Sequence, residues 1–175
     1  MTKTRQDLYL ILNNIRSAYN VGSIFRTADG AGVAKIYLCG ITPVPSAIGG
    51  ATGQAPSKIA KTALGAEKSI SWEYYKQALR LLKKLQATGV QIVVLEQTPR
   101  SIDYRKFKPK FPMALIVGNE VRGINKKILS YANKIVEIPM YGKKESLNVA
   151  VATGIALYQL SEKRRWNYLL KLLNA

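Results

Sequence analysis

The sequence predicts an α/β domain in which a parallel sheet carries helices on both faces. Three observations support this prediction. Short apolar runs that suit buried strands alternate along the chain with segments of helical periodicity. The 175 residues fit one domain, and a hydrophobic content of 47% is enough to form a core. Polar, glycine-bearing loops follow the apolar runs, and α/β proteins bind their ligands beyond such strand ends.

Five apolar runs are predicted as strands. They comprise residues 8–12, 36–39, 90–95, 113–117 and 134–138. The segments between them are predicted to hold helices. Beside the first helix, these are a short helix within 57–67, an amphipathic helix over 71–86, and a short helix near 126–131. Residues 41–57 are rich in Gly, Pro and Ser and form a long connection, which in a compact domain is usually functional or mobile.

The first helix is predicted to begin at Asn20, a residue type that caps helices well. Its apolar positions recur at i, i+3, i+4 and i+7 and form a core stripe of Val21, Ile24, Phe25 and Ala28. Gly22, Arg26 and Asp29 lie off this stripe and are expected to face elsewhere. Arg26 could simply pair with Asp29, an interaction worth about 0.2–0.5 kcal/mol on a helix surface.

The last helix is predicted over residues 147–160, where only Asn148, Thr153 and Gln159 are strongly polar. A helix that is apolar all round is expected to be buried all round, against its own core on one side and something else on the other. A tail over residues 162–173 shows helical spacing as well. The loop before this helix therefore has rigid support on both sides, which a functional site needs.

The absence of histidine and the single cysteine exclude several kinds of chemistry. Without histidine the chain lacks the usual general base and the commonest metal ligand. Cys39 alone can form neither an internal disulfide nor a cysteine metal site, so no metal is predicted. No apolar run reaches about 18 residues, and residues 1–10 lack the apolar core of a signal peptide. We therefore expect a cytoplasmic protein with no membrane partner.

The formal net charge of +17 points to a polyanionic partner. One interpretation is a lysine-rich, solvated surface. The alternative, a nucleic-acid phosphate backbone as partner, is favoured because 27 lysines and arginines face only ten carboxylates.

Three polar loops follow predicted strands and are expected to converge: residues 13–20, 118–124 and 139–148. A glycine at position 118 would let a ligand approach the backbone. Neither a dinucleotide fingerprint nor a P-loop is present. In isolation, however, 118–124 could be only a turn, Ser146 a helix cap and Asn148 a first-turn polar residue. The residues alone indicate a basic α/β protein with a ligand site at the strand ends.

Three motifs, in order, resemble the TrmH (SpoU) family of RNA ribose 2′-O-methyltransferases in the SPOUT superfamily. They are N-x-G-x-x-x-R at residues 20–26, G-N-E-x-x-G-I at 118–124, and I-P-M at 138–140 followed by S-L-N at 146–148. The similarity covers nearly the whole chain and includes K-T-A-L-G-A-E at 61–67. The resemblance implies one SPOUT domain over residues 1–175, without a separate RNA-binding domain. It also implies a C-terminal deep trefoil knot and a homodimer.

The resemblance further implies S-adenosylmethionine as cofactor and tRNA or rRNA as substrate. Carried over by position, the cofactor-binding residues would be Gly118, Ile138, Met140 and Leu147. The catalytic set would be Asn20, Arg26, Glu120, Ser146 and Asn148.

Within that set, the arginine is the residue implicated in activating the hydroxyl. Because an isolated guanidinium is a very poor base, we expect Arg26 to grip the target's phosphate and ribose and to stabilise the developing alkoxide. Asn20, Ser146 and Asn148 would orient Arg26 and the sugar, with Glu120 as the nearby carboxylate. The residue that accepts the proton stays open.

Two other functions are considered. A non-catalytic RNA-binding SPOUT-like assembly factor would have no need of the five polar motif residues, all of which are present. A base methyltransferase from another SPOUT branch fits the S-L-N motif less well than ribose methylation does.

Overall fold

The computed structural model describes residues 6–45 and 57–173, and its centre is a seven-stranded sheet in the order β3-β2-β1-β6-β4-β7-β5. The strands are β1 Leu8–Asn13, β2 Lys35–Cys39, β3 Trp72–Tyr75, β4 Gln91–Leu95, β5 Ile102–Asp103, β6 Met113–Val117 and β7 Lys134–Glu137. The helices are α1 Ala18–Gly30, α2 Lys58–Ala63, α3 Ala66–Ser69, α4 Ala78–Ala87, α5 Lys126–Leu129 and α6 Val149–Leu173. Every strand pair is parallel.

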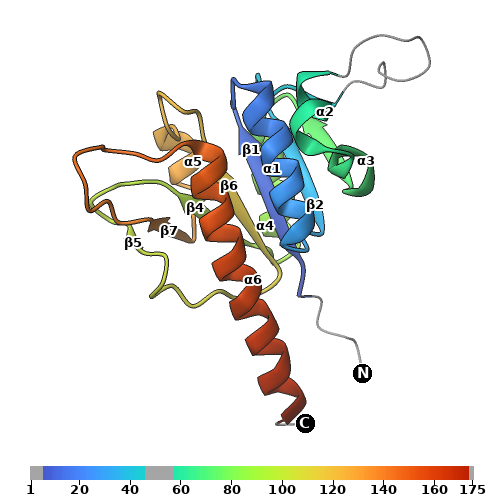
Figure 1. Cartoon of the computed structure of the whole chain (residues 1–175). Helices are drawn as coiled ribbons and strands as arrows, with labels where there is room; N and C mark the ends of the chain where they lie inside the picture. The colour runs from blue at the N-terminus through green and yellow to red at the C-terminus, as the bar shows by residue number, and fades with distance from the viewer. Residues whose placement is uncertain (1–5, 46–56, 174–175) are drawn as a thin grey trace.

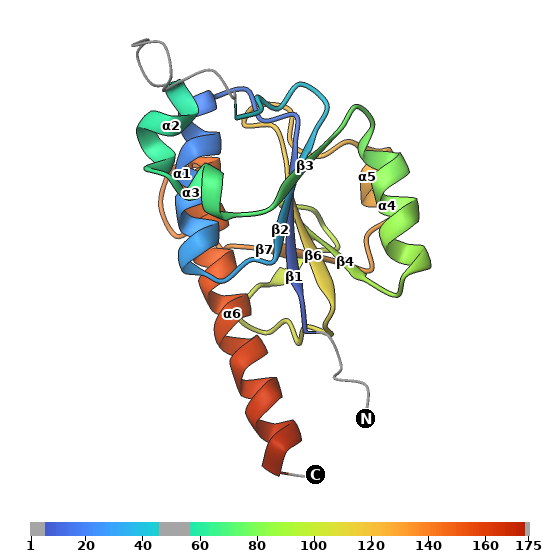
Figure 2. The ribbon, with the colours of Figure 1, turned by 90° about the vertical axis from the view of Figure 1, so that its right-hand side faces the viewer.

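Helices cover both faces of this sheet, as Figures 1 and 2 show. The helices α1, α2, α3 and α6 lie on one face, and α4 and α5 lie on the other. The two faces carry separate clusters of buried apolar residues. All five residues of β6 are buried, as expected for a strand covered on both sides. The predicted parallel α/β class is confirmed, whereas the trefoil knot stays a prediction.

The start of α1 differs from the prediction. Ser17, not Asn20, caps the helix, because the Ser17 side chain accepts a hydrogen bond from the Asn20 backbone N–H. The predicted core stripe is buried throughout. Gly22 is buried as well, contrary to expectation, because α2 crosses α1 there. A Cβ atom at Gly22 would lie 2.3 Å from the Ile59 carbonyl oxygen, so only glycine permits this approach.

The amphipathic helix predicted over residues 71–86 is wrong in its first part. Trp72–Tyr75 forms β3, which pairs with β2 at the sheet edge, and the helix α4 begins only at Ala78. Three aromatic residues in four suit a pleated edge strand, and pairing with β2 overrides the helical spacing. A further short strand, β5, lies in the segment between β4 and β6.

The last helix is one continuous element, and the chain's own fold buries only one side of it, so its burial on every side stays a prediction. Thr153, Ala156, Leu157 and Leu160 are buried on one side of α6. On the opposite side Val151, Ile155 and Tyr158 are 51%, 36% and 57% exposed. The helix runs on past the sheet as a single rod, visible in Figure 1.

Two cations attach the second half of α6 to the rest of the fold. The Lys163 ammonium donates to the backbone carbonyls of Tyr104, Arg105 and Phe107, and burial lowers its pKa. Arg164 donates to the carbonyls of residues 31 and 32 on the other side. These contacts explain why the predicted tail continues the helix. No helix in the described ranges is long and apolar enough to cross a membrane.

Candidate active site

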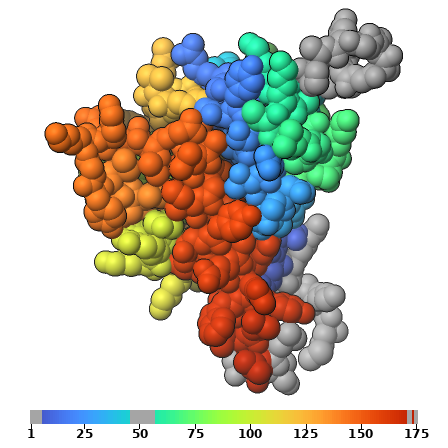
Figure 3. Space-filling model, in the orientation of Figure 1, coloured from blue at the N-terminus to red at the C-terminus, as the bar shows by residue number. Residues whose placement is uncertain are grey.

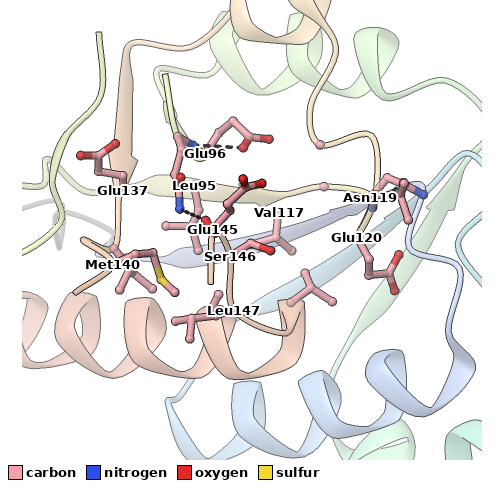
Figure 4. A pocket seen from close by; sticks show the side chains of 17 residues that line it. Leu95, Glu96, Val117, Asn119, Glu120, Glu137, Met140, Glu145, Ser146 and Leu147 are labelled. Atoms are coloured by element: carbon pink, nitrogen blue, oxygen red, sulfur yellow. Dashed lines mark hydrogen bonds between the residues drawn. The ribbon is translucent and has the colours of Figure 1, made fainter. Parts of the chain in front are cut away.

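A pocket of about 390 Å³ lies at the carboxyl ends of β4, β6 and β7, and we call it the strand-end pocket. Its volume is within the range of small-molecule sites, roughly 300–1,000 Å³. Figure 4 shows it between the strand ends and the start of α6. Its apolar lining comes from Leu95, Val117, Val121, Ile138, Met140, Leu147, Val149 and Ala152. The four residues predicted to hold a cofactor, Gly118, Ile138, Met140 and Leu147, all line it.

Gly118 shapes one wall of the strand-end pocket. A Cβ atom at this position would lie 2.5 Å from Ile124 Cδ1 and 3.1 Å from the Gly123 carbonyl carbon. Ile124 is itself only 6% exposed, so it has little room to move. Glycine is therefore required for the 118–124 loop to fold back over the end of β6.

A chain of hydrogen bonds joins the three predicted loops. Asn148 caps α6, since its Oδ1 accepts from the backbone N–H groups of Ala150 and Val151. Its Nδ2 donates to Asn20 Oδ1 at 3.2 Å, and Asn20 Nδ2 donates to Glu120 Oε1 at 3.0 Å. Each amide accepts a hydrogen bond through its oxygen and donates one through its nitrogen, so donors and acceptors alternate consistently from Asn148 to Glu120. The predicted convergence of the loops is confirmed.

Glu120 ends this chain and closes it onto the first loop. Its two carboxylate oxygens accept from the backbone N–H groups of Arg16 and Ser17, in addition to the Asn20 amide. Burial raises the pKa of Glu120, but hydrogen bonds to backbone N–H groups and to Asn20 outweigh it and leave the pKa below the ordinary value. Glu120 is therefore an ionised carboxylate that holds the 118–124 loop against the 13–20 loop, and we call it the Glu120 clamp.

Ser146 and Asn148 differ in what their side chains do. The helix cap that the sequence could also have assigned to Ser146 is provided by Asn148 instead. Ser146 is exposed and lines the strand-end pocket. Within the described residues its hydroxyl makes no hydrogen bond, so it can still bind a ligand.

Four carboxylates line the strand-end pocket: Glu96, Glu120, Glu137 and Glu145. They are four of only ten acidic residues in the chain, and no lysine or arginine is among the described lining residues. Figure 4 shows Glu96, Glu137 and Glu145 grouped at the side of the pocket away from Glu120. A basic chain thus contains an acidic pocket.

Two of these carboxylates brace the pocket walls. Glu96 Oε2 accepts from the Ile124 backbone N–H at 2.8 Å and so holds the 118–124 loop. The Ser101 hydroxyl donates to the Glu137 carboxylate at the end of β7. Neither residue is among the site residues predicted from the sequence. Their signal was weak, since each is only one polar residue at the end of an apolar strand.

Arg26 does not line the strand-end pocket. It lies on the exposed side of α1, six residues beyond Asn20, beside Lys61 and Tyr158. The alternative in which Arg26 pairs with Asp29 is not realised within the described residues. The structure thus brings Asn20, Glu120, Ser146 and Asn148 together. Arg26 lies about 9 Å from Asn20 along the axis of α1, at roughly 1.5 Å of rise per residue.

The matching regions of known proteins agree with this architecture. The SpoU rRNA Methylase family matches residues 7–158, which is most of the chain. The chain belongs to this family. It is 32% identical to a tRNA (guanosine(18)-2′-O)-methyltransferase of Aquifex aeolicus over 94% of this chain and 73% of that protein. It is also 32% identical to a 23S rRNA (guanosine-2′-O-)-methyltransferase of Shewanella oneidensis, over 94% of this chain and 63% of that protein.

Solved structures resemble this SpoU family chain closely. The A. aeolicus TrmH/SpoU tRNA modifying enzyme superposes with a TM-score of 0.77 at 31% identity, over 94% of this chain and 79% of that one. An AdoMet-bound rRNA methyltransferase from Sinorhizobium meliloti gives a TM-score of 0.80 at 29% identity, over 91% and 57%. The chain therefore spans between about half and four fifths of the lengths of these relatives.

The SpoU family chain has one thiol, and it lies outside the site. Cys39 is buried at the end of β2, and burial raises its pKa to about 12. A thiol with so high a pKa is not a nucleophile at neutral pH. The Cys39 thiol is therefore not a candidate for the chemistry of this site.

Proposed function

We propose that this chain transfers a methyl group from S-adenosylmethionine to a ribose 2′-hydroxyl of tRNA or rRNA. The observation that carries the proposal is that the second and third motifs line one pocket, and a side chain of the first is hydrogen-bonded to both. The relatives named for guanosine 2′-O-methylation of tRNA and of 23S rRNA support the same reaction. A cytoplasmic site of action would follow from such substrates.

The strand-end pocket fits the proposed cofactor in shape and charge. Its apolar residues, such as Leu95 and Leu147, suit an adenine ring, and the bare backbone at Gly118 allows close approach. Its four carboxylates favour a ligand with a positively charged sulfonium and ammonium. When bound, the cofactor supplies an electrophilic methyl group. Gly118, Ile138, Met140 and Leu147 would hold it in place.

The polar residues would position the ribose. Because Asn20 and Asn148 use both amide ends within the loops, they keep the three loops in register. The Ser146 hydroxyl is available to hydrogen-bond the sugar. Glu120 is a weak base because its pKa is lowered, so it serves as a clamp and does not take the proton. Arg26 would bind phosphate and ribose and stabilise the developing alkoxide.

A homodimer would explain the position of Arg26. The exposed apolar residues of α6 recur at i, i+4 and i+7, forming a stripe of Val151, Ile155 and Tyr158. A second copy packed on this stripe would bury it. Tyr158 and Arg26 also line one shallow surface depression, so a two-fold contact at this stripe would direct Arg26 of each protomer towards its partner. We propose that each site combines one protomer's pocket with the partner's arginine.

Mixing two inactive variants tests this composite site. Arg26→Ala and Ser146→Ala homodimers should each be inactive. If the two residues come from different protomers, a heterodimer retains one site with both residues intact, and mixing restores activity. If both residues act within one protomer, mixing restores nothing. Light scattering that finds only monomers at micromolar concentration would contradict the dimer itself.

The reaction is tested by incubating the protein with methyl-labelled cofactor and bulk cellular RNA. A methyl group on the 2′-oxygen blocks alkaline cleavage at that nucleotide, so the label should appear in alkali-resistant dinucleotides. Label in the mononucleotides that alkaline cleavage releases would indicate base methylation. Tight RNA binding without any transfer to tRNA or rRNA would indicate an RNA-binding assembly factor.

A further inference from the structure

A second hollow lies on the helical face of the molecule, and we call it the helix-face depression. It is lined by Ser23, Arg26 and Thr27 of α1, Lys61 and Thr62 of α2, Leu64, and Tyr158 of α6. Figures 1 and 3 show α1 lying between α2 and α6 on this face. Three helices far apart in the sequence therefore contribute to one surface.

The helix-face depression has the chemistry of an anion site. Arg26 and Lys61 are both exposed and carry positive charge, and none of the described residues that line it is acidic. The hydroxyl of Thr62 donates to the Tyr19 carbonyl at 3.0 Å, so it is already engaged within the fold. In the described part of the chain the hydroxyls of Ser23 and Tyr158 make no hydrogen bond. They remain available as donors beside the two cations.

Lys61 is placed beside Arg26 by a close helix contact. Gly22 lets α2 approach α1, and Thr62 is hydrogen-bonded to the backbone at Tyr19. These contacts fix the last turn of α2, and with it Lys61, against the exposed side of α1. A guanidinium and an ammonium held at one surface suit an oxyanion with several acceptor atoms.

We propose that Lys61 and Arg26 together bind one phosphate of the RNA strand next to the methylated nucleotide. This inference rests on the proposed function, and it adds Lys61 as an RNA-positioning residue. Arg26 and Lys61 come from one protomer and lie at one surface, so they would reach the same stretch of RNA. The phosphate contact would fix the register of the strand against the pocket.

The salt dependence of RNA binding tests Lys61 directly. Each phosphate contact contributes about 0.7–0.9 to the slope of log affinity against log salt. For labelled bulk tRNA, Lys61→Gln should lower this slope by part of that amount, because Arg26 still contacts the same phosphate, and should weaken binding several-fold. The KM for RNA should rise with little change in kcat. Lys127→Gln removes an equally exposed cation from α5, on the opposite face of the sheet, and should leave the slope unchanged.

Two results would overturn the proposal. One is a Lys61→Gln protein with the parent slope. The other is a Lys127→Gln protein whose salt slope falls as much as that of Lys61→Gln. Both lysines would then contribute only to a general attraction between the basic protein and RNA. If Lys61 only stabilises the last turn of α2, Lys61→Gln should lower the melting temperature and leave the salt slope of RNA binding unchanged.

A double-mutant cycle tests whether the two cations share one phosphate. If they do, Arg26→Gln combined with Lys61→Gln should weaken RNA binding by less than the product of the two single effects. Strict multiplication would contradict a shared phosphate. These readouts measure binding only. A protein that binds RNA through Lys61 but methylates no RNA would refute the proposed function and leave the phosphate site standing.

Discussion

The strand-end pocket and the helix-face depression both involve α6, yet their charges are opposite. Val149 and Ala152 of α6 line the pocket with four carboxylates, and Tyr158 of the same helix lines the depression with two cations. A charge acts most strongly on groups within a few ångströms, and salt screens it beyond about 10 Å. The local lining therefore decides which ligand enters, whatever the net charge of +17.

This difference separates the two proposed substrates. An acidic pocket repels phosphates and attracts a sulfonium, so RNA is kept out of the proposed cofactor site. The basic exterior attracts RNA from a distance and the depression binds it at short range. Substitutions on the two sides should therefore affect RNA and cofactor differently.

The largest effect is expected on the basic side, at Arg26. Because Arg26 is exposed and off the core stripe, Arg26→Ala should change the free energy of unfolding by less than about 1 kcal/mol. Binding of S-adenosylmethionine should survive, because Arg26 does not line the pocket. Methyl transfer should nonetheless fall by about 10²–10³, as for the removal of other transition-state donors. Single-turnover methylation at saturating RNA measures this.

Two variants complete the test of Arg26. Arg26→Lys should rescue little, because an ammonium lacks the planar fork. Arg80→Ala removes an exposed arginine from α4 and should methylate at the parent rate. A folded Arg26→Ala protein with the parent rate would remove Arg26 from the catalytic set.

On the acidic side, the strongest effect is expected at Gly118. The added methyl group of Gly118→Ala would overlap Ile124 Cδ1, whose distance from that position is 2.5 Å. Overpacking of this kind costs about 1–3 kcal/mol of stability. The strain should displace the 118–124 wall of the pocket, so calorimetry should show S-adenosylmethionine binding weakened by about tenfold or more. Gly142→Ala is the matched control, since nothing lies within 4 Å of its Cβ position. Parent affinity in Gly118→Ala would place the cofactor elsewhere.

A smaller effect should reveal the charge of the pocket itself. Glu145→Gln keeps the shape of the side chain and removes one carboxylate from the lining. The affinity for S-adenosylmethionine should fall by roughly threefold to tenfold, about 1 kcal/mol of Coulomb energy. S-adenosylhomocysteine lacks the sulfonium charge and should be affected less. Glu162→Gln, an exposed change on α6 outside the pocket, is the control. An equal loss for both ligands would disprove charge selection.

Salt should distinguish the two ligands. RNA affinity should fall linearly with the logarithm of salt concentration, whereas cofactor affinity should barely change. Reversing the exposed charges at Lys143 and Lys144 should lower the RNA slope by about 0.7–0.9 for each phosphate that these lysines bind in the parent protein. Filter binding at several salt concentrations measures this. RNA affinity that is independent of salt would mean that the high charge contributes only to solubility.

The smallest expected effect concerns the Glu120 clamp. The folded state lowers the pKa of Glu120 from 4.5, so the ionised form stabilises the fold above that pH. This contribution is lost as the pH falls through the lowered pKa. The free energies of unfolding of the parent and Glu120→Gln should therefore differ by about 1 kcal/mol or less at neutral pH and converge in acid. Urea unfolding at pH 7 and below pH 4 measures this, and a pH-independent difference would contradict it.

The elements predicted correctly from the sequence are those whose periodicity reflects burial on one or two faces. The β6 run at residues 113–117 and the α1 stripe are found where the pattern placed them, since hydrophobic spacing follows directly from burial. The motifs also identified the loops that converge at the strand ends. Where the pattern was ambiguous, as at Trp72–Tyr75, the edge of the sheet decided between strand and helix.

Which side chains meet depends on the tertiary packing. Asn20 is separated from Glu120 by 100 residues and from Asn148 by 128. The first contact depends on the pairing of β1 with β6, and the second on the packing of α6 against α1. No local pattern specifies such a pairing, because strand order depends on how the whole chain packs. The same packing gathered four scattered glutamates into one pocket and placed Lys61 beside Arg26. The sequence specifies how many acidic and basic residues there are. Their separation into an acidic pocket and a basic depression arises from long-range packing.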